Sequence, residues 1–211
     1  PRSAPARKLA AFSLTELMVV LGIIGLLATL GFPMLKTLSQ GNAISAASRQ
    51  LMDDISLARM KAINNRTTVY MVFAPTNLAA QVTRIRALTN DARQLKMMTN
   101  LIAGQYSAYA LVARRTAGDQ PGRPTPRYLT EWRTLPDGIF FAPTKYTPMT
   151  LANWRLVDPT NRPFAYLTLP FPTATSPELA VPCLAFNSLG QIERSVPVPI
   201  PDEVIPLTKG S

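Results

Sequence analysis

The sequence contains no histidine and a single cysteine, Cys183, among its 211 residues. Without an imidazole, the chain can supply neither a histidine general base nor a histidine ligand for a metal ion. One cysteine excludes an internal disulfide bond, so we expect Cys183 to be a buried thiol, with an intermolecular disulfide as the alternative. Neither a P-loop nor a dinucleotide-binding fingerprint occurs. We therefore predict a protein that is not an enzyme and needs no cofactor.

Acidic residues are also few, because 12 acidic side chains stand against 22 basic ones and give a formal net charge of +10. Adjacent carboxylates occur at Asp53-Asp54 and at Asp202-Glu203. We expect the first pair on the solvated side of a helix. The second pair could contribute to a Ca²⁺ site, but this ion takes about six to eight oxygen ligands, and two neighbouring acids supply few of them. We predict no metal site.

A long run without charge lies near the start of the chain, over residues 17–35. As a helix, these 19 residues would extend about 28 Å, which is close to the hydrocarbon thickness of a bilayer. Basic residues precede the run, and an excess of positive charge keeps that end of a membrane segment in the cytoplasm. We therefore predict a membrane-spanning helix over residues 12–35, with the rest of the chain exported. The basic residues are Arg2, Arg7 and Lys8.

Two other kinds of N-terminal segment share some of these features. A secretory signal peptide has a shorter apolar core that is followed by a small-x-small cleavage site, whereas the small pair Ala10-Ala11 precedes the core here. A plain membrane anchor gives no reason for Glu16, because an ionisable group at the membrane edge is costly without a partner. A plain membrane anchor remains an alternative, but it does not account for the order of the residues.

Residues 11–16 read Ala-Phe-Ser-Leu-Thr-Glu and lead directly into the apolar run. This order resembles the class III signal of type IV pilins and type II secretion pseudopilins, which has a basic leader, Phe after the cut and Glu as the fifth residue. The resemblance implies a leader over residues 1–11, cleavage by a prepilin peptidase between Ala11 and Phe12, and N-methylation of Phe12. It also implies a helix bend at Pro33. The family usually has Gly where this chain has Ala11.

Glu16 has two compatible interpretations. Residues 13–16, Ser-Leu-Thr-Glu, match the capping box S-x-x-E, in which the Ser and Glu side chains accept hydrogen bonds from free backbone N–H groups at a helix start. The family resemblance implies instead that Glu16 pairs with the α-amine of Phe12 of a neighbouring subunit during filament assembly. We favour this assembly role, and the capping box remains available to an isolated subunit.

Beyond the charge-free run, apolar residues recur at steps of three and four, which is the period of one face of a helix. This pattern predicts that residues 36–65 form the amphipathic second half of the helix, packed against a sheet and ending at Asn64-Asn65. The apolar positions are Ile44, Ala47, Leu51, Ile55, Ala58 and Ala62.

Residues 66–211 are expected to form a β-rich globular domain. Near its end, Gly190 follows Asn187-Ser188-Leu189, and we expect this glycine to supply the positive φ of a hairpin. Segments rich in β-branched and aromatic residues predict strands. They lie at residues 67–73, 106–112 and 164–169, and the hairpin strands at 183–186 and 191–195.

Two further segments of this domain carry other patterns. A short amphipathic helix is expected between Asp91 and Gly104, which have the properties of a start and a stop. Residues 81–87 alternate in polarity, and we expect a short strand or a loop there. Residues 49–73 and 184–195 resemble the corresponding regions of the GspH/FimT-like minor pseudopilins.

The predicted fold class is α+β, with a long N-terminal α-helix packed on a small antiparallel β-sheet in the manner of a pilin. The resemblance implies a minor pilin or pseudopilin, which is a structural subunit of a type II secretion or type IV pilus-like filament. Its expected partners are a prepilin peptidase, other pilin subunits and inner-membrane lipid. The expected location is the bacterial inner membrane, which the chain would cross once, with the N-terminus in the cytoplasm and the C-terminal domain in the periplasm.

Nucleic-acid binding is the alternative function. Basic side chains next to aromatic ones can hold phosphates and stack bases, and some FimT-like minor pilins resemble DNA receptors. A solvated basic face is the plainer interpretation of the same residues, and we favour it. The residues that would contact DNA are Arg114, Arg115, Arg127, Trp132 and Arg133.

Overall fold

The computed structural model describes residues 14–86, 91–115, 118–120, 125–147, 162–193 and 203–210, without the side chains of residues 28–41 and 84–85. Two compact units divide the chain, Pro1–Asn42 and Ala43–Ser211. The first unit contains the beginning of helix α1, which runs over Leu14–Asn65. Only the part of α1 from Ala43 onward belongs to the second, β-rich unit.

The predicted membrane-spanning segment at residues 12–35 is wrong. Among the described residues, no helix is long and apolar enough to cross a membrane. The predicted location, a single-pass protein of the inner membrane, is corrected for the same reason.

The predicted fold class also needs correction. Its membrane-spanning first half is not found in the described part of the chain, and the two compact units share α1 between them. The structure therefore does not show one long helix packed as a whole on a sheet. The bend expected at Pro33 lies outside the residues whose side chains are described, and Ala11 and Phe12 lie outside the described residues altogether.

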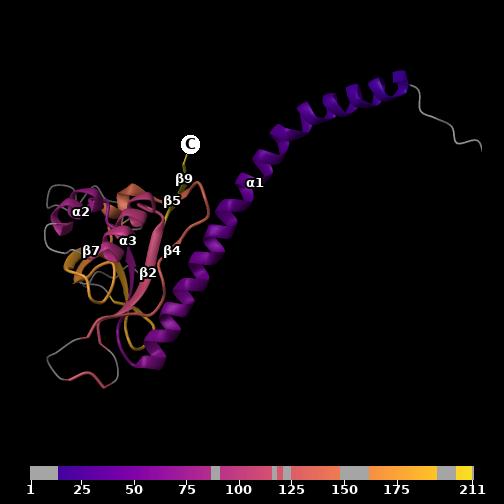
Figure 1. The fold of residues 1–211 in the computed structure, drawn as a ribbon. Coiled ribbons are helices and arrows are strands. Elements are labelled where there is room, and N and C mark those ends of the chain that lie inside the picture. Colours follow the sequence, from indigo (N-terminus) through magenta and orange to yellow (C-terminus); the bar gives the residue numbers. More distant parts are fainter. Residues whose placement is uncertain are drawn as a thin grey trace, which may run out of the picture. The chain divides into compact units, whose positions relative to one another are not determined.

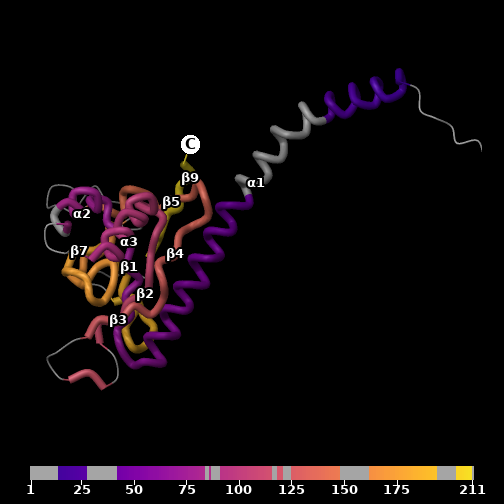
Figure 2. Tube along the Cα trace, in the orientation of Figure 1, coloured from indigo at the N-terminus to yellow at the C-terminus, as the bar shows by residue number. Residues whose placement is uncertain are grey.

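The second unit contains an antiparallel sheet of seven strands, which is larger than the small sheet we expected. Five strands follow the spatial order β3-β2-β1-β7-β6, while β4 pairs with β2 and β8 pairs with β7. Figures 1 and 2 show these strands and the course of the chain between them. The strands are β1 (Val69–Phe73), β2 (Ala108–Ala113), β3 (Arg127–Tyr128), β4 (Arg133–Thr134), β6 (Ala165–Pro170), β7 (Glu178–Phe186) and β8 (Ile192–Glu193).

A second, two-stranded sheet joins β5 (Ile139–Phe141) to β9 (Leu207–Lys209). It brings the last described residues of the chain against the middle of the domain, because Phe141 lies opposite Leu207. The 3-10 helix η1 (Pro143–Tyr146) follows β5 directly.

Two short helices precede strand β2. Helix α3 (Ala92–Ala103) has Asp91 as its N-cap, whose side chain accepts hydrogen bonds from the backbone N–H groups of Arg93 and Gln94, and Gly104 as its C-cap. The helix predicted between these two caps is confirmed. Helix α2 (Leu78–Arg86) overturns the strand or loop predicted at residues 81–87. It is helical because Leu78 and Val82, one turn apart, both pack into the core.

The sheet of the second unit is buried on both faces, since successive side chains of a strand point to opposite sides. On one face, Tyr109 and Leu111 of β2 pack in a cluster with the end of α1. On the other face, Ala110 and Val112 pack in a cluster with residues of α2 and α3. Figure 1 shows α2 and α3 on the opposite side of β2 from the last turns of α1.

The predicted apolar face of α1 is largely confirmed within the second unit. Four of its six positions are buried, while Ile55 is partly buried and Ile44 is 39% exposed. Helix α1 ends at Asn65, as predicted, and Arg66 has a positive φ of 48°. The four buried residues are Ala47, Leu51, Ala58 and Ala62.

The predicted C-terminal hairpin is also confirmed. Strands β7 and β8 are antiparallel, with Phe186 opposite Ile192. Gly190 has a φ of 75°, a conformation that residues with a Cβ atom rarely adopt. A Cβ atom at Gly190 would also lie 2.9 Å from Cδ1 of Ile63. The hairpin turn therefore packs closely against the end of α1.

Candidate functional site

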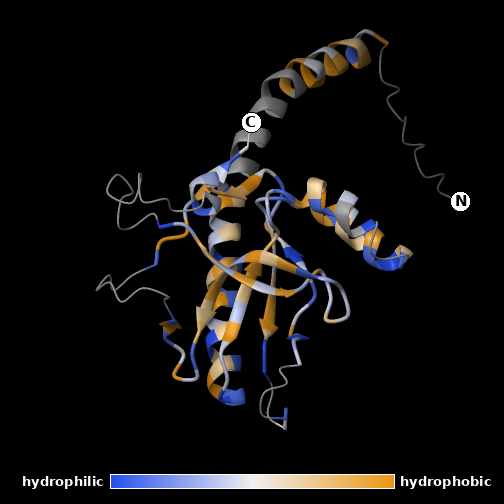
Figure 3. Ribbon diagram, turned by 90° about the vertical axis from the view of Figure 1, so that its left-hand side faces the viewer, coloured by the Kyte–Doolittle hydropathy of each residue, from blue (hydrophilic) through white to orange (hydrophobic). Residues whose placement is uncertain are grey.

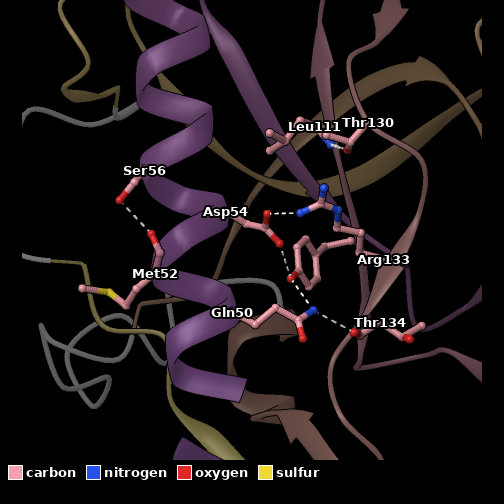
Figure 4. Close-up of polar contacts among 9 residues, drawn as sticks. Gln50, Met52, Asp54, Ser56, Leu111, Thr130, Arg133 and Thr134 are labelled. Atoms are coloured by element: carbon pink, nitrogen blue, oxygen red, sulfur yellow. Dashed lines mark hydrogen bonds and ion pairs between the residues drawn. The ribbon is translucent and has the colours of Figure 1, made fainter. Parts of the chain in front are cut away.

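A buried carboxylate links α1 to the sheet (Figure 4). Asp54 is 3% exposed. It accepts a hydrogen bond of 2.6 Å from the Tyr109 hydroxyl at Oδ2 and forms an ion pair with Arg133 at Oδ1. The amide of Gln50 donates to the Tyr109 hydroxyl and to the carbonyl of Thr134, each at 2.9 Å. This network joins one turn of α1 to strands β2 and β4.

The network corrects the expectation that both Asp53 and Asp54 lie on the solvated side of a helix. Asp53 is exposed and Asp54 is buried, because neighbouring residues of a helix point about 100° apart. Burial raises the pKa of Tyr109, and its hydrogen bond to Asp54 raises that pKa further. The hydroxyl therefore stays protonated at neutral pH and acts as a donor, so the arrangement serves structure rather than acid–base chemistry.

The structure divides the residues predicted to contact DNA between the two faces of the sheet. Arg133 lies opposite Tyr109 and turns toward α1, where Asp54 neutralises its charge. Trp132 belongs to the cluster on the other face, together with Tyr128. Arg127 lies opposite Ala113 and lines one groove together with Tyr128 and Trp132.

The side chains of Trp132 and Tyr128 already have interaction partners within the chain. Trp132 Nε1 donates to the carbonyl of Pro172 at 3.0 Å, and its ring meets Phe171 edge-on at 5.2 Å between centroids. The Tyr128 hydroxyl donates to the carbonyl of Pro170 at 2.9 Å. An open groove of about 880 Å³ lies over these residues, lined also by Met97 and by residues 172–174. Sequence reasoning did not predict this groove, because its two sides are 40 residues apart.

Arg114 and Arg115 lie at a different place, directly after β2. They line a small polar pocket of about 290 Å³ together with Thr67, Thr68 and Tyr70 at the start of β1. The two arginines are exposed. Of the five residues predicted to contact nucleic acid, these two share the small pocket, whereas Arg127 and Trp132 both line the larger groove.

A second buried ion pair involves the carboxylate that we weighed as a Ca²⁺ ligand. Nζ of Lys145, a side chain with 0% exposure, donates to Oε1 of Glu203 at 2.5 Å. The same ammonium lies 5.0 Å from the centroid of the Phe164 ring. Asp202 lies outside the described residues, among which no group of three metal-binding side chains occurs. Nothing in the sequence around Lys145 indicated that this lysine would be buried.

In the first unit, Glu16 lies in the first turn of α1. Its neighbours along the helix include Val19 and Val20, which are 61% and 48% exposed. The structure therefore places a carboxylate beside apolar side chains at the start of this helix.

No protein-family model, no curated protein and no solved structure matches the chain.

Proposed function

We propose that the chain is a pilin-like structural subunit, which assembles into a filament by packing the start of α1 against the same helix of neighbouring subunits. The observation that carries this proposal is the exposure of the apolar side chains over residues 14–27, a stretch of the ribbon that Figure 3 colours largely as hydrophobic. Large apolar side chains all around this segment are between 48% and 74% exposed. They are Leu14, Leu17, Met18, Val19, Val20, Leu21, Ile23, Ile24, Leu26 and Leu27.

A helix that is apolar on every side is stable only when other groups cover it. An exposed apolar surface of this extent is typical of an interaction site. Gly22 and Gly25 add to this argument, because a Cβ atom at either position would meet nothing within 4 Å. Neighbouring helices can therefore approach the backbone closely at these two residues.

Glu16 would set the register of this packing. Covering the helix would also bury the Glu16 carboxylate, and a buried charge is costly unless an opposite charge pairs with it. Cleavage between Ala11 and Phe12 would create an α-amine four residues before Glu16. That amine in a neighbouring subunit is the partner that the resemblance to pilins implies.

The first experiment tests processing. When the full chain is produced together with a prepilin peptidase, mass spectrometry should show the loss of residues 1–11, and Ala11→Gly should be cut at least as fast. A chain that keeps these residues, or that is cut after Leu30, would contradict the pilin-like assignment.

The second experiment tests assembly of the processed chain. Glu16→Gln retains the shape and a hydrogen-bonding side chain but removes the charge, so it should fold yet fail to enter filaments in cross-linking and pelleting assays. Asp53→Asn is the matched control, because it removes an exposed carboxylate from the same helix. If Glu16→Gln assembles as well as the control, helix capping suffices and the ion pair is not required.

We do not propose DNA binding as a second function. Arg133 is paired with Asp54, and the hydrogen-bond donors of Tyr128 and Trp132 are already bonded to the carbonyls of Pro170 and Pro172.

A further inference from the structure

A small polar pocket lies where α1 ends and β1 begins. Three side chains of the α1–β1 connection and of β1 line one side, and two arginines that follow β2 line the other. We propose that this pocket binds a phosphate group, which the guanidinium groups of Arg114 and Arg115 hold. The three remaining lining residues are Thr67, Thr68 and Tyr70.

Unpaired positive charge is the first argument. Arg133 and Lys145 each have a carboxylate partner, whereas neither Arg114 nor Arg115 forms an ion pair with any residue that the structure describes. The planar guanidinium group presents parallel N–H donors that match two oxygens of a phosphate. Two such groups at one pocket, on a chain with a net charge of +10, favour an anionic ligand.

The hydroxyl groups of the pocket supply the second argument. Tyr70 is partly buried, and its hydroxyl has no hydrogen-bond partner within the described part of the chain. Burial raises the pKa of Tyr70, and the nearby Glu193 carboxylate raises that pKa further. The hydroxyl therefore remains a donor at neutral pH and can donate to a bound oxyanion. Arg114 acts in the opposite direction on the same pKa, which indicates that its charge lies close to Tyr70.

The backbone of the pocket is held in place by a contact between its two sides. The Thr67 hydroxyl donates to the carbonyl of Arg115 at 3.1 Å, which fixes that residue relative to the start of β1. Strands β1 and β2 are paired just beyond this point, with Val69 opposite Ala113. The two arginines therefore extend from a well-supported strand end.

One acidic residue borders the pocket, and its charge predicts an effect on phosphate affinity opposite to that of the arginines. Glu193 of β8 accepts a hydrogen bond from the Thr68 hydroxyl at 3.2 Å. Its charge should repel a bound phosphate and weaken the affinity. Replacing Glu193 by glutamine should therefore strengthen binding, whereas replacing either arginine by glutamine should weaken it.

The size of the pocket limits what it can hold. A volume of about 290 Å³ lies at the small end of the range for ligand sites. The rings of Tyr128 and Trp132 belong to the groove of about 880 Å³, not to this pocket, so no base-stacking platform adjoins it. The pocket accordingly recognises the phosphate group itself, which could be free phosphate or one phosphodiester of a polymer.

The test is a calorimetric titration of the full chain with inorganic phosphate, carried out in a mild detergent that covers the apolar helix. Arg114→Gln and Arg115→Gln should each weaken binding about tenfold, and Glu193→Gln should strengthen it severalfold. The control is Arg93→Gln, which removes an exposed charge from α3, a helix that does not line the pocket. Urea midpoints of all variants separate lost binding from lost folding.

Two results would overturn the proposal. One is the absence of phosphate binding to the native chain at about 10 mM, a concentration at which even weak sites of this class are partly filled. The other is an equal loss of affinity in Arg93→Gln and Arg114→Gln, which would indicate attraction to net charge alone. A short single-stranded oligonucleotide distinguishes free phosphate from a phosphodiester as the ligand. If the pocket accepts a phosphodiester, the oligonucleotide should compete with inorganic phosphate, and its binding should be lost in the same two arginine variants. Glu16→Gln should leave all of these affinities unchanged, so this test is independent of filament assembly.

Discussion

The hydroxyl of Tyr109 donates a 2.6 Å hydrogen bond to the buried carboxylate of Asp54, and so joins β2 to a residue of α1 that lies 55 positions earlier. The other carboxylate oxygen pairs with Arg133 of β4. Such buried polar networks are directional, so they specify how elements align more than they add stability. Here the network determines which turn of α1 lies against which residues of the sheet.

Replacing the buried carboxylate should therefore be costly. Asp54→Asn removes the charge that balances Arg133 and should lower the free energy of unfolding by about 1–3 kcal/mol, since the Arg133 side chain is 48% exposed and water can still solvate it. Asp53→Asn is the control at an exposed neighbouring position, where changes of about 0.5 kcal/mol or less are expected. Urea unfolding of the full chain measures both. Equal midpoints for the two variants would contradict a structural role for Asp54.

The position of Asp54 could have been predicted from the sequence, although we expected it to be solvated. It lies three residues after Leu51 and four before Ala58, both of which are buried on the apolar face of α1. The helical period therefore points this carboxylate toward the sheet. We expected Asp54 to be exposed because adjacent acidic residues usually are, although the helical period of the buried residues indicated the opposite. The partners Tyr109 and Arg133 could not be found from sequence, because strand pairing brings them to α1.

Local signals predicted local structure well. Asp91 and Gly104 predicted the limits of α3, and Gly190 predicted the turn of the β7–β8 hairpin. Each of these depends on a few neighbouring residues whose backbone chemistry is decisive. The prediction of a strand or loop at residues 81–87 was wrong because a short alternating pattern also fits one side of a helix. The contacts of α2 with the core favour the helix over the strand.

Signals that depend on distant contacts or on long segments were less reliable. The charge-free run predicted a membrane-spanning helix, and no such helix occurs in the described residues. The basic and aromatic residues from Arg127 to Arg133 suggested one surface, but only Arg127, Tyr128 and Trp132 line a common groove, whereas Arg133 turns to the other face of the sheet and pairs with Asp54. Only the pairing register of β2 decides which side chains share a face.

The buried pair of Lys145 and Glu203 should behave as a coupled unit. Lys145→Met removes the ammonium that faces the Glu203 carboxylate, whose side chain is 13% exposed, and should cost about 3–5 kcal/mol. Glu203→Gln removes the carboxylate that faces a fully buried ammonium and should cost a similar amount. The double variant removes both charges, so its loss should be smaller than the sum of the single losses by about 1–3 kcal/mol. Urea unfolding of the native chain, the two single variants and the double variant measures this coupling as a double-mutant cycle. Strictly additive losses would contradict direct coupling between the two side chains.

The buried thiol of Cys183 predicts how stability changes at alkaline pH. This side chain is 4% exposed in the core between the sheet and the two short helices. Burial raises the pKa of the Cys183 thiol to about 12, whereas a thiol in an unfolded chain has a pKa of about 8.5. The folded state therefore retains a proton that the unfolded state releases. The stability from this difference is fully present below about pH 8.5 and is lost as the pH rises toward 12, by at most about 1.4 kcal/mol per pH unit.

Comparison with Cys183→Ala isolates this contribution, because burial also raises the pKa values of Tyr109, Tyr128 and Tyr146 and makes both chains less stable at higher pH. The variant loses a fixed amount of stability through the small cavity that it leaves, independent of pH. Its disadvantage against the native chain should thus shrink steadily between about pH 8.5 and 10.5, as the native chain alone loses the thiol contribution. Urea unfolding at intervals of half a pH unit measures the difference. A difference that stays constant over this range, or fast labelling of the folded thiol at pH 8, would contradict the burial of Cys183.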